Sequence, residues 1–474
     1  MRYPAFIGGA YKSGNPFAAN ERTMNLYYEP VQSEGGVNEG ILRPTPGVEV
    51  YSAQAATNSS PGRALQVWNG RAYAVIGTEF FEVQAGGARV PRGSVALDPR
   101  PAAIVYNGSG GGQIAIASGG ALYIYDTTTH AFSTPVTPSQ VTTVVMLDGY
   151  FIILDRQTSA IYQSDLLNGL SWDGGNTAKR IIAGDPWLHA HVHGKELWLF
   201  GEHTSEVWYN AGTFPFTFAI HPSGSINYGI AAPWSAVSVG DALLWLSGTK
   251  SGAGEVMMSV GFQPRVVSDF ALSHAIASYS RIDDAIGWTY EKEGHQFYVL
   301  NFPTANATWV LDLSTMRWHE RGTWVSEQNT FQQWRPCFHA VFDGKSICAN
   351  VVGGELFALN DGGLDVDQRP IRRIRRAPYI TNELKRLFFA SMKLHLLTGR
   401  GNLSGQGTDP VVELRVSDDG ETWWSAGMAS AGTRGNYEQF PEWTRLGSGL
   451  NRLFEIQMSD PVPWSIVNAY VEVR

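Results

Sequence analysis

A short β-hairpin pattern recurs seven times between residues 64 and 350, and it constrains the fold more than any other feature. Each copy has a few β-prone residues, a turn that contains glycine, and a second apolar run. The turn glycines are 38, 41, 45, 46, 54 and 50 residues apart: Gly70, Gly108, Gly149, Gly194, Gly240, Gly294 and Gly344. Four of these turns are Asn-Gly or Asp-Gly, which fit two-residue type I′ turns because both central residues adopt positive φ.

Most copies are followed by a second β-prone pair. After KELWLFG at 195–201, for example, come SEVWYN at 205–210 and FPFTFAI at 214–220. Four short strands in 40–50 residues is the period of a propeller blade. The pattern therefore predicts an all-β chain built on a six- or seven-bladed β-propeller. A long sandwich, or several small β-domains, is the alternative that the spacing leaves open.

The rhythm changes at both ends of the repeat. Residues 1–62 have few periodic runs and are expected to form an extended N-terminal segment that packs on the propeller, which we assign to residues 63–368. Residues 369–474 have longer alternating strands and wider connections, as in RLFFASMKLHLLTG and PVVELRVSDDGETWW. This rhythm predicts a C-terminal β-sandwich or jelly-roll-like domain.

The composition agrees with this fold and excludes several classes of protein. Glycine accounts for 52 of 474 residues, and Trp, Tyr and Phe together for 57, as expected of many short strands joined by tight turns. No apolar run is long enough for a transmembrane helix, and we expect no signal peptide at MRYPAFIGGAYKSG. The net charge of −8 argues against coating of nucleic acid, although it permits a local basic patch.

Two groups of residues have spacings that could suit a metal ion. His189, His191 and His193 alternate, so in a strand they share one face that a divalent metal could use. Because the set lacks an obvious carboxylate ligand and His193 occupies the turn position, we favour ordinary strand and turn histidines. Asp361, Asp365 and Asp367 form the second group at 361–367, but the spacing of a calcium loop is missing, and a solvated acidic loop is the favoured interpretation.

Other short motifs favour structural roles. Cys337 and Cys348 flank one hairpin turn in diagonal positions, which favours two buried, reduced thiols over a disulfide. Residues 418–423, DDGETW, partly match the Asp-box turn of sialidase-type propellers, which braces a hairpin and has no catalytic part. We find no P-loop, nucleophile elbow or zinc-protease motif, and predict neither an enzyme nor a bound cofactor or metal.

One strong charge run begins the C-terminal domain. Arg369, Arg372, Arg373, Arg375 and Arg376 fall within eight positions. Arginines this close together repel one another and need anionic partners or water. A solvent-exposed linker, a subunit interface and DNA contact are the alternatives, and the five residues are our candidate subunit-interface residues.

Several segments resemble the packaged-DNA stabilisation proteins, or tail hub accessory factors, of short-tailed phages. The resemblance rests on LWLFGEHTSEVWYNAG at 197–212, INYGIAAPWSAVSVGDALLWL at 226–246 and GFQPRVVSDFALSHAIASY at 261–279. It also includes YQSDLLNGLSWDG at 162–174, where Asn168 stands in place of a common Asp, and NLYYEP and LRPTPG near the N-terminus. The C-terminal 100 residues or so resemble the family more weakly.

The resemblance implies a structural virion protein that closes the neck of the phage after DNA packaging. It implies a homo-oligomer, commonly a hexameric ring, that joins the portal and its adaptor to tailspike or tail fibre and tail needle proteins. DNA would pass through the assembly without sequence-specific contact, no membrane would be involved, and assembly would take place in the host cytoplasm. The alternative from another class is a glycan-binding or glycan-hydrolysing propeller used in host adsorption.

Overall fold

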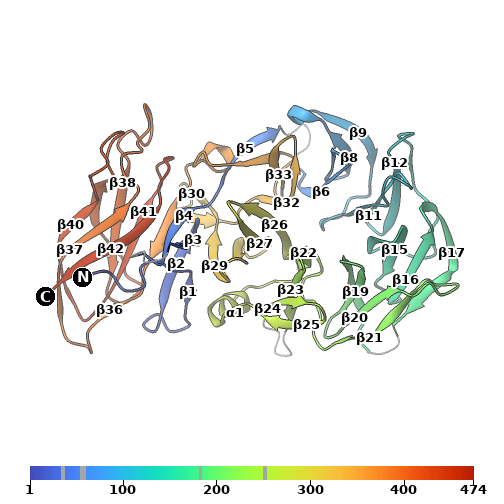
Figure 1. Cartoon of the computed structure of the whole chain (residues 1–474), viewed down its shortest axis with the longest axis horizontal. Coiled ribbons are helices and arrows are strands. Elements are labelled where there is room, and N and C mark those ends of the chain that lie inside the picture. The colour runs from blue at the N-terminus through green and yellow to red at the C-terminus, as the bar shows by residue number, and fades with distance from the viewer. Residues whose placement is uncertain (34–37, 54–59, 181–183, 249–253) are drawn as a thin grey trace.

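The computed structural model describes residues 1–33, 38–53, 60–180, 184–248 and 254–474. A ring of small sheets occupies one side of the molecule, and a second β-domain, which holds both chain termini, occupies the other (Figure 1). Over the described ranges the single α-helix is α1 (Phe270–Ala277), and three short 3-10 segments accompany it: η1 (Ala85–Gly87), η2 (Pro233–Ser235) and η3 (Val366–Gln368). None of the helices in these ranges is long and apolar enough to cross a membrane.

The ring is a β-propeller with seven blades in the described part of the chain. Each predicted hairpin supplies the first two strands of one blade. Six of the seven blades are separate four-stranded sheets. The remaining blade, which is sixth along the chain, is part of a larger sheet. The first four blades contain β6 (Gly62–Trp68), β7 (Arg71–Ile76), β8 (Glu79–Val83), β9 (Arg89–Ser94), β10 (Ala103–Tyr106), β11 (Gln113–Ser118), β12 (Ala121–Asp126), β13 (Phe132–Ser133), β14 (Thr143–Leu147), β15 (Tyr150–Asp155), β16 (Ala160–Asp165), β17 (Asn168–Lys179), β18 (Trp187–His193), β19 (Glu196–Gly201), β20 (Ser205–Asn210) and β21 (Phe218–Ile226). The last three contain β22 (Val237–Val239), β23 (Ala242–Gly248), β24 (Gly254–Val260), β25 (Gln263–Val266), β26 (Ile286–Lys292), β27 (His295–Phe302), β28 (Ala307–Asp312), β29 (Arg317–Arg321), β32 (Pro336–Phe342), β33 (Lys345–Asn350) and β34 (Leu356–Asn360). A small hairpin, β30 (Thr323–Val325) with β31 (Thr330–Gln332), connects the last two blades.

The turn residues explain three of the seven inner hairpins. Asn69, Asp148 and Asp343 have φ of 49°, 50° and 53°, and each precedes a glycine that also has positive φ, as a type I′ turn requires. Asn107 behaves differently. Tyr106 pairs with Ile114, so Asn107 and Gly108 open a longer loop instead of forming a two-residue turn.

The last blade is completed by a strand from the N-terminal segment. β5 (Gly47–Ser52) pairs antiparallel with β34, with Val48 opposite Leu359. The first and last parts of the propeller are thereby hydrogen-bonded to each other, which closes the ring and leaves β34 without a free edge. The predicted boundary between residues 62 and 63 therefore separates β5 from the blade that it completes. The domain boundaries stay predictions.

The second domain is a β-sandwich that draws strands from both ends of the chain. One sheet has the order β3-β4-β42-β37-β40, and the facing layer contains β35, β41, β38 and β39, with β36 beside β41. Its strands are β3 (Leu26–Pro30), β4 (Gly40–Pro44), β35 (Arg373–Arg376), β36 (Ile380–Thr381), β37 (Leu387–Leu396), β38 (Val411–Ser417), β39 (Trp424–Ser430), β40 (Glu442–Gly449), β41 (Asn451–Met458) and β42 (Ile466–Val473). Leu26 and Leu42 of the N-terminal segment are buried with Phe454 and Trp464 in one core. The first residues of the chain thus contribute to both domains.

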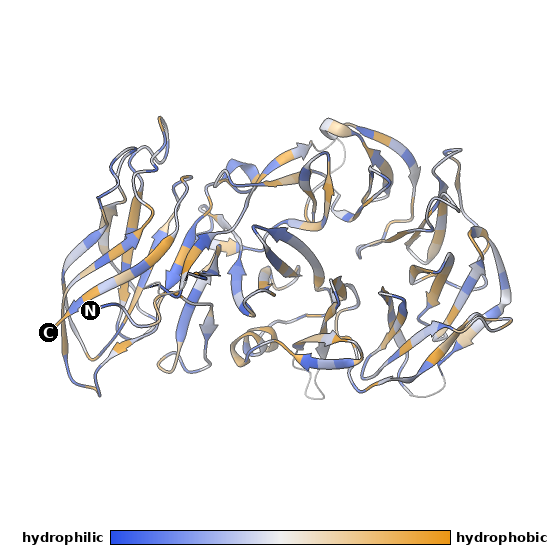
Figure 2. Ribbon diagram, viewed as in Figure 1, coloured by the Kyte–Doolittle hydropathy of each residue, from blue (hydrophilic) through white to orange (hydrophobic). Residues whose placement is uncertain are grey.

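Apolar side chains hold neighbouring blades together. In Figure 2 hydrophobic residues recur along the strands of the blades. Trp198 and Trp245, from adjacent blades, are 1% and 0% exposed, and their ring centroids lie 6.0 Å apart. Burying an aromatic side chain of this size contributes a few kcal/mol at about 25 cal/mol per Å² of apolar surface.

The innermost strands of the blades surround a central cavity of 360 Å³. Its lining includes large side chains, among them His191, Trp234, Trp288, Phe338 and His339. Side chains therefore fill much of the space around the propeller axis.

Candidate functional site: the polar joint between the two domains

The two domains meet in one continuous sheet. β2 (Asn20–Met24), which is also paired with β1 (Tyr11–Lys12), lies between β29 of the propeller and β35 of the sandwich. It runs parallel to β29 and antiparallel to β35, and β35 in turn pairs with β41. Backbone hydrogen bonds thus connect the sixth blade to the sandwich, so relative motion of the domains would break sheet pairing.

A row of charged side chains crosses this joint. Arg22 of β2 lies directly opposite Arg376 of β35, an arrangement that is destabilising unless anions compensate for it. Glu320 of β29 accepts hydrogen bonds from Arg22, and the closest N–O distance is 2.8 Å. Glu455 of β41 accepts from Arg376 on its other side, with a closest distance of 2.8 Å between Nη2 and Oε2.

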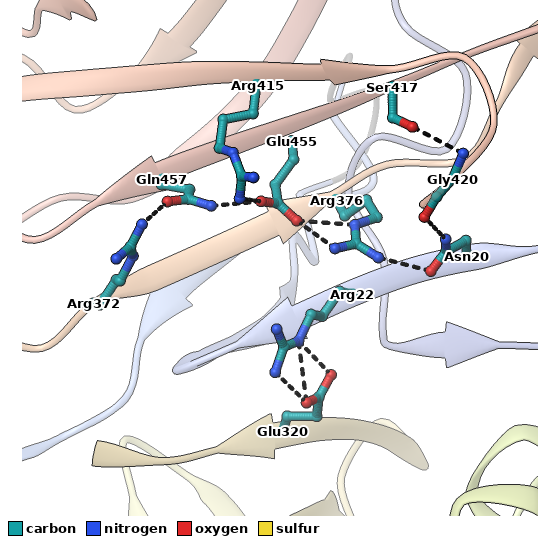
Figure 3. Close-up of polar contacts among 10 residues, drawn as sticks. All are labelled: Asn20, Arg22, Glu320, Arg372, Arg376, Arg415, Ser417, Gly420, Glu455 and Gln457. Atoms are coloured by element: carbon teal, nitrogen blue, oxygen red, sulfur yellow. Dashed lines mark hydrogen bonds and ion pairs between the residues drawn. The ribbon is translucent and has the colours of Figure 1, made fainter. Parts of the chain in front are cut away.

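Glu455 is the centre of this polar joint (Figure 3). It is 1% exposed and also accepts a hydrogen bond from Arg415 of β38, at 3.2 Å. Gln457 donates to Glu455 and accepts from Arg372. Asn20 accepts from Arg376 and donates to the Gly420 carbonyl, which connects β2 to the loop between β38 and β39.

Aromatic rings cover the guanidinium groups on this face. The guanidinium carbon of Arg376 lies 4.4 Å from the ring centre of Trp423, and that of Arg372 lies 4.0 Å from the ring centre of Trp324. Stacking of this kind excludes water and favours the planar guanidinium over an ammonium group.

Arg373 and Arg375 point to the opposite face of β35 because side chains alternate along a strand. Arg375 is 0% exposed and donates to the carbonyl groups of Ala5, Phe6 and Gly9 and to the Thr23 hydroxyl. It therefore fixes the first residues of the chain against the joint.

Burial weakens the basicity of both internal arginines. It lowers the pKa of Arg375 to about 10 and the pKa of Arg373 to about 9, and in Arg373 the nearby charge of Arg321 adds to the effect. The pKa of Arg22 shifts in the opposite direction. Burial is the largest single influence and would lower its pKa, but the charge of Glu320, the hydrogen bonds to Glu320 and the charge of Glu455 together outweigh it, so the pKa of Arg22 is raised.

The structure thus divides the five candidate interface arginines. Arg373 and Arg375 are buried, and Arg372 and Arg376 make the internal contacts described above, so these four are used within the chain. Arg369 is different: its side chain is 30% exposed, and it forms an ion pair of 2.9 Å with Glu327, which is 66% exposed. A subunit interface stays a prediction, and Arg369 is the member best placed to take part in one.

The alternating histidines make ordinary hydrogen bonds. His191 and His193 both contact the Ser238 hydroxyl, at 2.9 and 3.0 Å, and His189 packs against Trp234. Burial lowers the pKa of His189 to about 3 and that of His191 to about 4, with a smaller effect from the neighbouring histidine in each case. No group of three or more His, Cys, Asp or Glu residues within the described ranges is arranged to hold a metal ion.

The cysteines and the Asp-box turn take the structural roles expected of them. Cys337 and Cys348 are both free and buried, as predicted. Asp419 accepts hydrogen bonds from the backbone of Glu421 and Thr422 and from Ser417, and so braces the β38–β39 hairpin. These bonds hold the pKa of Asp419 below its usual range.

The three acidic residues at 361–367 separate in space instead of forming one loop site. Asp361 forms an ion pair with Lys292, and Asp367 with Arg335. Asp365 is 3% exposed and accepts hydrogen bonds from Thr323 and Trp334, so the solvated acidic loop expected from the sequence is wrong for this residue.

Two family models together match nearly the whole chain. The model described as bacteriophage P22 Gp10, beta-propeller, matches residues 6–362, and the one described as bacteriophage P22 Gp10, beta-sandwich, matches residues 372–474. The chain belongs to the bacteriophage P22 Gp10 family. This confirms the suspected family, a family of phage proteins that stabilise packaged DNA, and it confirms the predicted fold class.

Solved structures that are similar to this Gp10-family chain share little sequence with it. The N-terminal domain of Nup159 is 11% identical, with a TM-score of 0.42, and the match covers 72% of this chain and 98% of that one. Virginiamycin B lyase from Staphylococcus aureus is 10% identical, with a TM-score of 0.42, over 66% of this chain and 99% of the other. The sequence matches no curated protein.

Sequence reasoning missed the anionic half of the joint in this Gp10-family protein. Glu320 and Glu455 lie far from the arginine run in sequence and belong to strands that look like ordinary blade and sandwich strands. One signal was available. A charged residue at an inward position of an otherwise apolar strand, such as Glu455 in LFEIQM, predicts a buried partner of opposite charge.

Proposed function

We propose that this protein is a structural component of the phage tail hub that closes the neck after packaging and joins the portal and its adaptor to the distal tail. The matches to the two P22 Gp10 family models carry this proposal. The tailspike or tail fibre and the tail needle are the proposed distal partners.

The joint between the domains supports a mechanical, structural role. A continuous sheet crossed by a row of ion pairs resists bending between propeller and sandwich, because bending would separate Arg22 of β2 from Glu320 of β29. A rigid connection between the two domains suits a protein that holds several neighbouring subunits in fixed positions.

The propeller axis is a poor route for DNA. The central cavity is 360 Å³, the volume of a sphere about 9 Å across, and is lined by side chains such as Trp234 and Trp288, whereas the major groove of duplex DNA alone is about 12 Å wide. We therefore propose that DNA passes through a lumen between copies of the chain in a hexameric ring. A net charge of −8 favours sliding without sequence-specific contact.

We also infer that the role is non-enzymatic, with no cofactor and no membrane contact. The side chains with the strongest charge pairing in the joint are engaged with one another, so they are not available to a substrate. In the assembly, Arg369 and Glu327 are the proposed contact residues for a neighbouring copy.

Imaging and mass measurement together test the proposal. The purified chain, alone and mixed with portal–adaptor complexes, should be measured by native mass spectrometry and negative-stain electron microscopy. A ring at the tail vertex is the expected result. The proposal would be wrong if the chain stays monomeric, does not bind the portal complex, and hydrolyses or binds host polysaccharide. That result would favour the glycan-directed alternative.

A further inference from the structure

Two loops at opposite ends of the molecule expose leucine side chains, and neither loop takes part in the polar joint. One connects β16 and β17 in the third blade, and the other connects β36 and β37 in the sandwich (Figure 1). Leu167 of the first loop and Leu384 of the second have φ of 57° and 60°, and no other leucine in the described ranges has a positive φ. A bulky residue in this backbone region is strained, and such strain clusters at functional surfaces.

The loop of residues 165–171, here called the leucine loop, is fixed in place by its own neighbours. The Leu167 N–H donates to the Gly149 carbonyl at 2.9 Å, and the Leu167 carbonyl accepts from Asn107 at 3.2 Å. The Gly169 N–H donates to a side-chain oxygen of β11 at 2.7 Å. Three leucines of this ordered loop are nevertheless exposed: Leu166, Leu167 and Leu170.

The surface around the leucine loop is apolar and acidic. Phe214 is 96% exposed and lies in the loop between β20 and β21. That loop adjoins the same inner turn as the leucine loop, because Asn210 donates to Asp148 at 2.9 Å. Asp148 and Asp165 are exposed, and their side chains accept hydrogen bonds from the neutral groups of Asn210 and Ser171. Neither carboxylate forms an ion pair within the described ranges.

The loop at the sandwich end is also apolar. Leu384, in residues 382–386, is 70% exposed. Phe388 of β37 and Leu450 of the β40–β41 turn are exposed as well, and β36 pairs with β41 right beside that turn. Residues 382–386 together with Phe388 and Leu450 are here called the basic tip. Exposed apolar side chains that gather in this way mark interaction sites.

The cations of the basic tip outnumber its carboxylates. Lys385 lies 3.5 Å from Glu383, but both side chains are largely exposed, so this pair is weak. Arg386 donates to a serine hydroxyl of β40 and forms no ion pair in the part of the chain that the structure describes. The adjacent pair of Arg474 and Glu472 adds no net charge. The basic tip is therefore positive, whereas the surface at the leucine loop is negative.

These two surfaces suit each other better than either suits a copy of itself. Two leucine loops would bring the carboxylates of Asp148 and Asp165 together, and like charges across an interface repel. The two surfaces lie at opposite ends of the long axis of the chain, so one copy cannot join them internally (Figure 1). Contact between copies is then head-to-tail, and such an interface forms a ring when the rotation between copies closes.

We propose that the leucine loop of one copy binds the basic tip of the next copy. The exposed leucines and Phe214 would pack against Leu384 and Phe388, and Asp165 would face Arg386. This inference rests on the proposed function for the existence of a ring, and it adds the pair of surfaces through which neighbouring copies meet.

Disulfide cross-linking tests the contact in the full chain. Leu170→Cys and Leu384→Cys are introduced together, and the chain is oxidised with copper phenanthroline, alone and with portal–adaptor complexes. The two native cysteines are buried, so they do not compete. We expect a ladder of linked copies from the double variant and only dimers from a mixture of the two single variants. In the control, Leu403→Cys replaces Leu384→Cys on another exposed loop of the sandwich and should give no ladder.

Charge reversal tests the proposed pairing independently. Asp165→Lys and Arg386→Glu should each weaken assembly about tenfold in mass photometry, because each places like charges in contact. Both changes in one chain should restore assembly to within about threefold of the parent. Arg265→Glu changes an exposed arginine of β25 and should alter assembly less than twofold.

The outcomes separate this inference from the proposed function. Absence of a ladder from the double-cysteine chain, or failure of the paired charge reversal to restore assembly, would overturn the inference. Rings bound to the portal complex without a ladder would overturn the inference and leave the proposed function standing. Absence of any ring would count against both.

Discussion

Glu455 is the buried carboxylate at the centre of the polar joint. Its carboxylate lies on β41 between Arg376 of β35 and Arg415 of β38, and it is 1% exposed. Glu455→Gln keeps the size of the side chain and removes the charge. Arg22 and Arg376, which face each other across β2 and β35, then have only Glu320 to compensate for their repulsion.

The expected loss follows from the burial of each pair. The Arg376 side chain is 14% exposed, and removing one partner of a buried pair costs about 3–5 kcal/mol. Arg415 is 32% exposed, and its pairing contributes about 1 kcal/mol or less. Since the glutamine carbonyl still accepts one hydrogen bond, we expect a total loss of about 3 kcal/mol in the free energy of unfolding of the sandwich.

A double-mutant cycle measures this energy. Urea unfolding is compared for the parent chain, Glu455→Gln, Arg376→Met and the double variant, and amide hydrogen exchange in β35 reports on the joint itself. The coupling energy should be about 2 kcal/mol. Glu472→Gln is the control, because its pair with Arg474 is 53% and 76% exposed and should contribute almost nothing. A coupling energy below about 0.5 kcal/mol, or equal losses in Glu455→Gln and the control, would refute the reasoning.

Three further predictions follow from buried groups. Arg375→Met removes four hydrogen bonds, three of which hold residues 5–9 and one of which goes to Thr23. Limited proteolysis should therefore cut within residues 5–13 faster, and the free energy of unfolding should fall by about 3 kcal/mol, whereas unchanged cleavage would contradict this. Burial lowers the pKa of His319 to about 3, so between pH 6.5 and pH 3 the unfolded chain binds a proton there that the folded chain does not. The free energy of unfolding should therefore decline as the pH falls through that range. His319→Gln should reduce the slope of unfolding free energy against pH by up to about 1.4 kcal/mol per pH unit. An unchanged slope would count against a neutral, buried imidazole. Burial raises the pKa of both Cys337 and Cys348, so Ellman's reagent should react with neither thiol in the folded chain and with both in denaturant, and fast labelling of the native protein would show that the blade opens.

Local sequence was enough to identify the blades. The hairpins at Asn69, Asp148 and Asp343 depend on two turn residues and on strands that follow at once in the chain, so composition and spacing predict them. The choice between six and seven blades needed β5. Its pairing with β34 joins Val48 to Leu359, and no local pattern shows which distant edge a short strand will cover.

The locations of the charged side chains were the feature that the sequence predicted least well. An isolated run from Arg369 to Arg376 suggests an exposed surface, since arginine is rarely buried without a partner. Only the fold brings Glu320 from a blade and Glu455 from the sandwich to the two sides of β2 and β35.

The sequence by itself therefore determined the all-β character, the repeated blades, the presence of a C-terminal sandwich and the family. The tertiary structure decided how the ring closes, how the two domains are joined and which arginines are internal. The physical reason is that turn and strand preferences act between neighbours in the chain, whereas strand pairing and charge compensation act between residues that only folding brings together.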